Sequence, residues 1–238
     1  MASASVISER AAPWGFADDR ALICIPGSAG SSLQGFCEWV TSPDFPERVR
    51  ASYLDGEIQL EMSPEAFDSH LAVKGEIQRV LSTLARNRKL GRFYPDGGLL
   101  KNEQAGLSVE PDGMFLGFET LRAGRVRLVS TPAQPRRLLL AEGTPDMVLE
   151  VVSRWSVAKD TKDLRRLYHK AGITEYWLID ARDEEIEFDI LIHEPDGYHP
   201  STTPEGLRRS KVFGRSFRLT REIDEAGHPD YTLEVVEL

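Results

Sequence analysis

The chain has 238 residues, of which 41% are hydrophobic and 28% are charged, a composition typical of a globular protein built around one large domain. Its net charge of −9 argues against a protein that coats nucleic acid without regard to sequence, because such binding depends on neutralising phosphates. No segment approaches the ~20 apolar residues of a membrane-spanning helix, and the N-terminus lacks the basic and apolar regions of a signal peptide. The chain contains only two cysteines, Cys24 and Cys37, which together with these features predicts a cytoplasmic protein.

Residues 1–45 are rich in Gly, Ser and Pro and predict an N-terminal extension, which precedes a main domain over residues 46–238. One short helix is expected around residues 36–40. Four aromatic side chains of this extension would be unfavourable in water, so we expect it to pack against the main domain: Trp14, Phe16, Phe36 and Trp39.

The next segments predict a hairpin, a helix and two strands. Asp55-Gly56 is a two-residue turn signal followed by alternating apolar residues, so residues 51–64 predict a β-hairpin. A helix is expected from about residue 65 to residue 87, where apolar side chains recur at helical spacing: Val73, Ile77, Val80, Leu81 and Leu84. Residues 92–102 and 106–118 each predict one strand, and residues 119–137 an irregular basic insertion.

The second half of the chain alternates strand and helix before becoming strand-rich. The sequence DMVLEVVS, residues 146–153, predicts a strand covered on both faces. Residues 159–172 predict a helix with one apolar face, because Leu164, Leu167, Tyr168 and Ala171 share a side and Gly172 favours a stop. Strands are expected over 174–180 and 185–194, with further short strands to the end. This order predicts an α/β core with a mixed sheet flanked by helices and a β-rich C-terminal part.

Glu150 interrupts the apolar run of its strand. A buried unpaired carboxylate costs several kcal/mol, so it should be protonated, paired or bound to a metal. The strand of Asp112 could lie beside that of Glu150, at the ~4.8 Å spacing of sheet neighbours, and such a pair of acids suits Mg²⁺. Asp146 lies ~13 Å away from Glu150 along the same strand and cannot share the ion.

Ordinary structural roles are the alternatives for these acids. Pro111-Asp112-Gly113 is also a common turn sequence. Glu150 could lie on an exposed face or pair with an arginine, and Asp146 could belong to a turn or face a helix.

A catalytic metal site also needs a cation that stabilises developing negative charge. Lys159 and Lys162 follow Glu150 by nine and twelve residues. A regular helix would direct Lys162 away from the apolar face and into solvent, whereas Lys159 precedes the helix and can turn back toward the strand end. The alternative for both lysines is a solvated surface charge.

Three segments in this order resemble the signature of the Uma-type restriction endonucleases, a bacterial branch of the PD-(D/E)XK nuclease superfamily. They are EPDGMFL, TPDMVLEVVS and KDLRRLYHKAGITEYWLIDAR. The segment YLDGEIQLEMSPEAFDSHLAV also resembles the N-terminal hairpin and helix of that family, with an early histidine, here His70. The resemblance covers roughly residues 50–195.

The resemblance implies a restriction-endonuclease-like core with its site where two strands diverge. Asp112 and Glu150 would bind Mg²⁺, with Mn²⁺ as a substitute, and the carbonyl of Val151 could add a ligand. Activated water would hydrolyse DNA phosphodiester bonds, with His70 assisting or serving only as a cap or packing residue. By analogy with the superfamily, a homodimer is expected.

The chain departs from the family pattern at the catalytic lysine. Val152 stands where the superfamily has its lysine, and Leu164 stands where the Uma-type branch has it, which makes Lys159 the first substitute and Lys162 the second. Two hypotheses of different classes follow. The chain is either a Mg²⁺-dependent endodeoxyribonuclease, with another phosphoester as a variant substrate, or a catalytically inactive nuclease-fold module that binds DNA or a protein.

Overall fold

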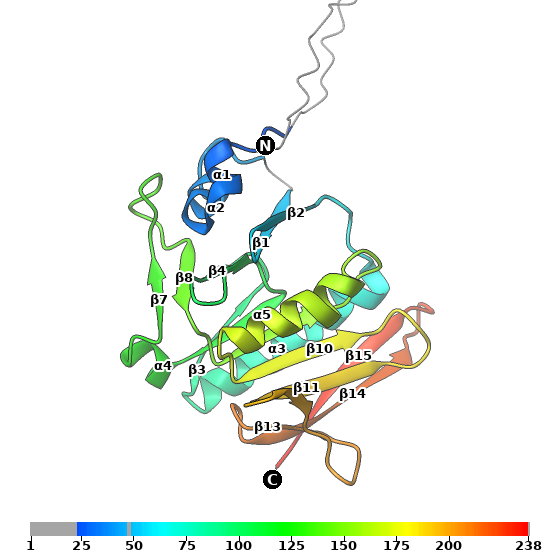
Figure 1. Ribbon diagram of the computed structural model, residues 1–238. Helices are drawn as coiled ribbons and strands as arrows, with labels where there is room; N and C mark the ends of the chain where they lie inside the picture. The colour runs from blue at the N-terminus through cyan, green and yellow to red at the C-terminus, as the bar shows by residue number, and fades with distance from the viewer. Residues whose placement is uncertain (1–22, 47–48, 238) are drawn as a thin grey trace, which may run out of the picture.

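The computed structural model describes residues 23–46 and 49–237. Its helical elements are α1 (Gly27–Ser31), α2 (Leu33–Val40), η1 (Phe67–Leu71), α3 (Ala72–Asn87), α4 (Phe118–Arg122), η2 (Lys159–Leu164) and α5 (Arg165–Lys170). Its strands fall into three sheets, and the predicted α/β architecture with a mixed sheet and a β-rich C-terminal part is confirmed (Figure 1). Within the described ranges, no helix is both long and apolar enough to cross a membrane.

The central sheet has the order β12-β11-β10-β9-β6-β3. Its strands are β3 (Gly91–Pro95), β6 (Gly113–Gly117), β9 (Met147–Val151), β10 (Glu175–Asp180), β11 (Glu187–Glu194) and β12 (Gly197–Pro200). Only β9 and β10 run parallel within this sheet. Because parallel neighbours need a crossover, the chain between them forms η2 and α5.

Two further sheets complete the molecule. The first has the order β2-β1-β5-β4-β8-β7 and consists of β1 (Arg50–Leu54), β2 (Glu57–Glu61), β4 (Leu99–Asn102), β5 (Leu107–Val109), β7 (Val126–Val129) and β8 (Leu140–Gly143). The C-terminal sheet consists of β13 (Arg208–Ser210), β14 (Arg215–Ile223) and β15 (Pro229–Val236). The N-terminal helices and the C-terminal sheet lie at opposite ends of the molecule in Figure 1.

The central sheet is covered on both faces, as the apolar run of β9 predicts. One face packs against α3 and the C-terminal sheet, with Met147, Leu149 and Val151 pointing into that core. The other face packs against α5 and the first sheet, and Val148 points to that side. Side chains alternate along a strand, so Glu150 shares the face of Val148 and lies beneath α5.

The N-terminal helices pack on the first sheet. Phe36 and Trp39 on α2 are buried together with Ala51 and Tyr53 of β1, in agreement with the expectation that these aromatic side chains turn away from solvent. Trp14 and Phe16 lie outside the described ranges. The division of the chain at residues 45 and 46 stays a prediction.

Three predicted segments differ from the structure. Residues 92–102 form β3 and β4 rather than one strand, and residues 106–118 form β5 and β6; each pair is split between two sheets. Both runs contain Pro-Asp-Gly, which interrupts a strand and lets the chain pass from one sheet to the other. The segment 119–137 is not wholly irregular, because it contains the end of α4 and all of β7.

Two glycines allow a direct test of the packing that positions β6. A Cβ atom at Gly91 would lie 2.2 Å from the Leu116 carbonyl oxygen, whereas one at Gly75 on α3 would meet nothing within 4 Å. We expect Gly91→Ala to lower the free energy of unfolding by about 3 kcal/mol. Gly75→Ala should raise it by about 0.5–1 kcal/mol, because alanine favours the helix. Urea denaturation of both variants checks this contrast, and equal effects would contradict it.

Candidate active site

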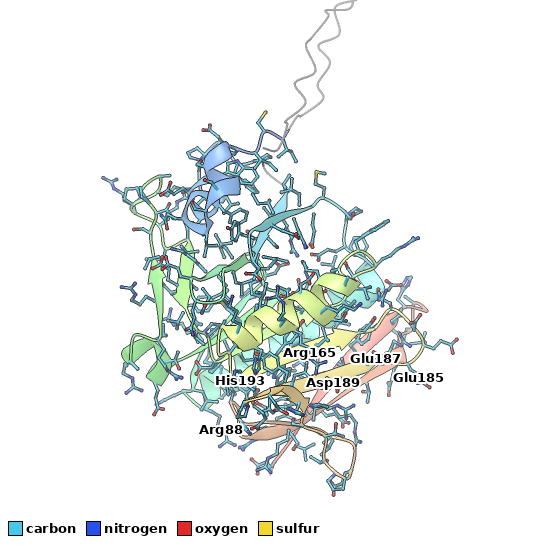
Figure 2. All side chains as sticks on the ribbon, viewed as in Figure 1. Arg88, Arg165, Glu185, Glu187, Asp189 and His193 are labelled. Atoms are coloured by element: carbon cyan, nitrogen blue, oxygen red, sulfur yellow. The ribbon has the colours of Figure 1, made fainter. Side chains whose placement is uncertain are left out.

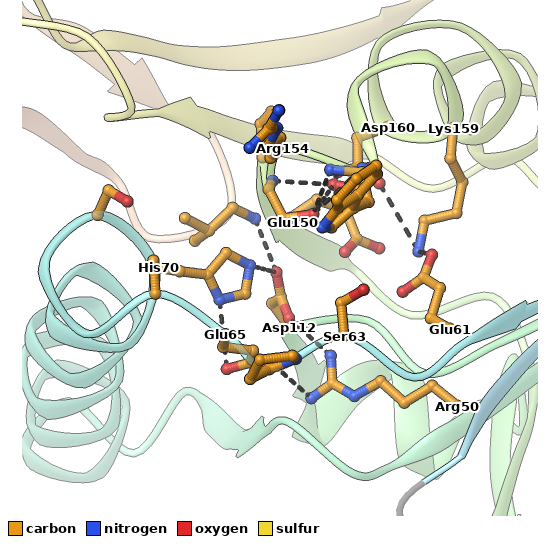
Figure 3. Close-up of a pocket in the computed structure, with 18 of the residues that line it drawn as sticks. Arg50, Glu61, Ser63, Glu65, His70, Asp112, Glu150, Arg154, Lys159 and Asp160 are labelled. Carbon is orange, nitrogen blue, oxygen red and sulfur yellow. Dashed lines mark hydrogen bonds and ion pairs between the residues drawn. The ribbon is translucent and has the colours of Figure 1, made fainter.

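A cavity of about 980 Å³ opens beside the ends of β6 and β9. The turn from β2 into η1, residues 59–66, forms one wall, and the segment from Val151 to Lys159 at the end of β9 forms another. Asp112, Glu150, Lys159 and His70 all line it (Figure 3). The structure thus brings together four of the side chains that the sequence singles out.

Asp112 and Glu150 occupy opposing positions on neighbouring strands. Gly113 pairs with Leu149 in the antiparallel ladder of β6 and β9, so the next pair outward is Asp112 and Glu150. Asp112 lies in the bend before β6, and its Oδ2 accepts a hydrogen bond of 2.9 Å from the Val151 amide. The amide and the carbonyl of one strand residue point to the same side of the strand. The Val151 carbonyl is therefore expected to point to the side of Asp112, as its amide does.

Glu150 is buried, with 3% of its surface exposed. Its hydrogen-bond donor is Tyr168 on α5, whose hydroxyl lies 2.5 Å from Oε1, rather than an arginine. Burial raises the pKa of Glu150 well above its usual value, and the nearby Asp112 and Asp160 carboxylates add to the rise, although Lys159 and Tyr168 oppose it. Glu150 is therefore a buried acid whose negative charge needs a cation or a proton beside it.

Asp160 is a third acid at the site. It lies on η2, accepts a short hydrogen bond from the Ser156 hydroxyl, and is 1% exposed. Its Oδ1 atom is buried and receives no hydrogen bond from any residue that the structure describes. Burial raises the pKa of Asp160 to about 7, with Lys159 and Ser156 lowering it and Asp112 and Glu61 raising it.

The raised pKa of Asp160 predicts a pH dependence of stability in metal-free protein. The folded pKa of about 7 exceeds the ordinary value of 3.8, so the folded state binds more protons between these values. The contribution of Asp160 to stability is therefore greatest below about pH 4 and is lost as pH rises through about 7.

Asp160→Asn removes this titration but keeps an acceptor for Ser156. We expect the variant to gain stability over the wild type as pH rises from about 4 to about 7, by on the order of 2–4 kcal/mol. Urea denaturation in chelator across this range measures the difference between the two proteins. A difference that stays constant with pH would contradict the burial of a titrating Asp160.

Lys159 reaches the cavity, and Lys162 does not. The Lys159 ammonium lies 2.5 Å from Glu61 Oε1 and 4.0 Å from Asp160 Oδ1. Burial lowers the pKa of Lys159, but the surrounding carboxylates Glu150, Asp160 and Glu61 outweigh this, so its pKa is raised and the group stays charged. Lys162 is exposed and is absent from the cavity lining.

A network of ion pairs surrounds Asp112 (Figure 3). Oxygens of Glu65, Asp96 and Asp112 lie within 4.8 Å of one another. Lys74 reaches all three, at 2.6, 2.8 and 3.4 Å. Arg50 also contacts all three, with 3.0 Å to Glu65 and 3.5 Å to Asp112. Both cations lie closer to Glu65 and Asp96 than to Asp112. The trio is therefore an ion-pair network in which Glu65 and Asp96 are compensated and Asp112 is held in place.

His70 belongs to the same network. Its Nε2 lies 3.5 Å from Asp112 Oδ2 and its Nδ1 3.3 Å from Glu65 Oε2, and the ring is buried. The contact with His70 lowers the pKa of Glu65 to about 2; burial opposes this, whereas Lys74 and Arg50 lower the pKa further. His70 is therefore not a helix cap but a side chain packed between two acids.

Several residues at the site were not found from the sequence. Arg50, Glu65, Lys74 and Asp96 belong to three separate segments, and only the fold brings them together. Two features of the sequence could have pointed to further residues of the site. Lys74 follows His70 by one helical turn and so shares its face, and Tyr168 lies on the apolar face of its helix although it carries a hydroxyl that needs a partner when buried.

Asp146 plays a structural role at the other end of β9. It accepts hydrogen bonds from the Gly117 amide and the Thr120 hydroxyl, both at 2.6 Å. It thus binds the first turn of α4, in agreement with the helix-facing alternative.

The chain was compared with known proteins. The family model Uma2, described as "Putative restriction endonuclease", matches residues 34–222. No match is found among curated proteins. One similar solved structure is described as a "putative nuclease belonging to DUF820" from Anabaena variabilis. It shares 20% identity and a TM-score of 0.42 over 68% of this chain and 89% of that chain.

Proposed function

The chain belongs to the Uma2 family, whose model is described as "Putative restriction endonuclease", and on this premise we propose that it is a divalent-metal-dependent endonuclease that hydrolyses phosphodiester bonds in DNA. The observation that carries the proposal is that Asp112 and Glu150 line one cavity together with the Lys159 ammonium, and that Asp112 accepts a hydrogen bond from the amide of Val151, the residue after Glu150.

The residues present fit a divalent cation. Asp112, Glu150 and the Val151 carbonyl offer only oxygen atoms, which suit Mg²⁺ or Mn²⁺. The Asp112 and Asp160 carboxylates raise the pKa of Glu150, and Asp112 also raises that of Asp160. Asp160 Oδ1 lacks a hydrogen-bond donor among the described side chains and amides. A cation between them would relieve both costs. When bound, it would supply Lewis-acid stabilisation of the charge that develops on the phosphate.

Lys159 supplies a positive charge in addition to that of the divalent cation. Its ammonium lies in the cavity beside Glu61 and stays protonated because the Glu150, Asp160 and Glu61 carboxylates raise its pKa. An oxygen of the scissile phosphate near Lys159 would be stabilised as negative charge grows on it. In this assignment Lys159 substitutes for the lysines that Val152 and Leu164 replace, and Leu164 itself is buried in the core.

His70, Arg50 and Lys74 position Asp112. They contact its two oxygens from one side while the Val151 amide donates to Oδ2. This leaves the direction of the Asp112 carboxylate fixed before any cation binds, which is the preorganisation that a metal site requires.

Cleavage of a supercoiled plasmid tests the proposal. Purified protein should nick or linearise it with Mg²⁺ or Mn²⁺ and leave it intact in chelator, and Asp112→Asn should be inactive while remaining folded. Cleavage that persists in Asp112→Asn, or that needs no divalent ion, would contradict it. Absence of cleavage with every ion would favour the second hypothesis, a nuclease-fold module that binds without turnover.

A further inference from the structure

Large apolar side chains stand exposed around the mouth of the cavity. Trp155 and Met62, both in its lining, are 71% and 65% exposed. Phe67 is 84% exposed and follows Ala66, another lining residue. Exposed apolar groups that gather in one place mark a candidate binding surface, distinct from the acids inside the cavity.

Trp155 is held on a braced turn rather than on a loose loop. The Ser153 amide donates to the Ser156 hydroxyl at 2.9 Å, and the Trp155 and Ser156 amides donate back to the Ser153 hydroxyl at 3.3 and 3.1 Å. The Ser156 hydroxyl in turn donates a hydrogen bond to the Asp160 carboxylate. The turn that presents the indole is therefore tied to the candidate catalytic acids.

Arg154 adds a cation to this surface. Its guanidinium carbon lies 5.2 Å from the centroid of the Trp155 ring. An aromatic ring next to a guanidinium is the combination on which unpaired nucleobases stack while the adjacent phosphate is neutralised.

The charge of the cavity disfavours a double helix. Duplex binding depends on neutralising phosphates along both strands, but the lining carries six carboxyl side chains against four Lys or Arg side chains. Base stacking does not depend on charge and contributes about 1–3 kcal/mol per base. In this cavity stacking is the larger source of affinity.

The neighbouring β10–β11 connection would repel a second strand. Arg182 of this connection lines the cavity, and a separate hollow beside it is lined only by acids: Asp180, Asp183, Glu184, Glu185 and Glu187. Figure 2 labels Glu185 and Glu187, two of these acids. A duplex brings a second line of phosphates to this acidic surface, which a single strand does not.

We propose that Trp155 is a stacking platform for an unpaired base and that the DNA bound at this site is single-stranded. This inference rests on the proposed nuclease function and specifies its substrate class. Trp155 is a binding residue in this account, placed beside the acids so that the stacked base brings its own phosphate into the cavity.

Fluorescence anisotropy in chelator tests the inference without cleavage. The three labelled probes are an oligothymidylate of about 16 nucleotides, an abasic backbone of the same length, and a duplex. This length is the upper end of the site sizes of single-strand binding folds. The wild type should bind oligothymidylate about tenfold more tightly than either other probe. Trp155→Ala should lose about tenfold for oligothymidylate and nothing for the abasic strand, whereas Trp155→Phe should retain most of the affinity.

Leu138→Ala is the control, because Leu138 is 67% exposed and does not line the cavity; it should bind like the wild type. Circular dichroism confirms that each variant is folded. Equal binding of Trp155→Ala and wild type to oligothymidylate, tighter binding of the duplex, or no binding of any probe would overturn the inference. Binding is measured in chelator and does not depend on a metal. A failed cleavage assay would therefore contradict the nuclease assignment without changing the binding result.

Discussion

Replacing Glu150 with glutamine is expected to abolish metal-dependent cleavage and leave the fold intact. Glutamine keeps the shape of the side chain and can still accept the hydrogen bond from Tyr168, but it removes the charge that a cation requires. Loss of several kcal/mol of charge stabilisation in the transition state corresponds to a fall in rate of about a thousandfold or more. Because burial raises the pKa of Glu150, removing its charge should not destabilise the protein near neutral pH.

Glu142→Gln is the matched control for this experiment. Glu142 is a partly buried glutamate on β8, paired with Lys101 at 3.1 Å, and it does not line the cavity. Its variant should cleave like the wild type. Plasmid cleavage rates and thermal unfolding of both variants measure the two effects, and a Glu150→Gln protein with undiminished activity would remove Glu150 from the site.

Replacing Lys159 with methionine should lower the cleavage rate by about 100- to 1,000-fold, the cost of removing one preorganised group that stabilises transition-state charge. The cation is expected to bind at least as tightly as before, because a positive charge near Glu150 and Asp160 has been removed. The cleavage rate should therefore fall while the metal affinity does not. The loss of a merely structural lysine would not separate these two quantities.

Lys162→Met is the control for Lys159. The two lysines lie one turn apart on η2, but Lys162 is exposed and outside the cavity lining. Single-turnover cleavage together with calorimetric titration of Mn²⁺ separates the two roles. If both variants were equally impaired, or if both were fully active, Lys159 would not be the substitute for the missing family lysine.

The sequence was most informative where local periodicity and strand pairing decide the structure. The apolar run around Glu150 predicted a strand covered on both faces, and β9 is buried between two cores. The face of Glu150 stays open in the sequence, and the structure places it beside Val148 beneath α5. The sequence also predicts that the strand of Asp112 could lie beside that of Glu150, and β6 does pair with β9.

Lys159 shows how a helix boundary affects such reasoning. The prediction that Lys159 precedes the helix is wrong, because Lys159 lies in the π-type segment η2, a feature that is frequent at functional sites. Lys159 and Asp160 both lie in this segment and face the cavity, while the regular spacing still placed Lys162 correctly in solvent.

The rest of the site depends on contacts between distant segments. Arg50 begins β1, Glu65 precedes η1, and Asp96 begins the bend after β3. No local pattern relates these positions, because their proximity arises only when the first sheet packs beside the central one. The same packing explains why two predicted strands each divided at Pro-Asp-Gly, since these turns carry the chain between the sheets.

Calorimetric titration of Mn²⁺ into the wild type and Glu150→Gln at neutral pH tests the central assignment most directly. One saturable Mn²⁺ site is expected in the wild type and should be lost in the variant, whose unfolding transition is unchanged. Equal binding by both proteins, or no binding by the wild type, would contradict the assignment of a metal to Asp112 and Glu150.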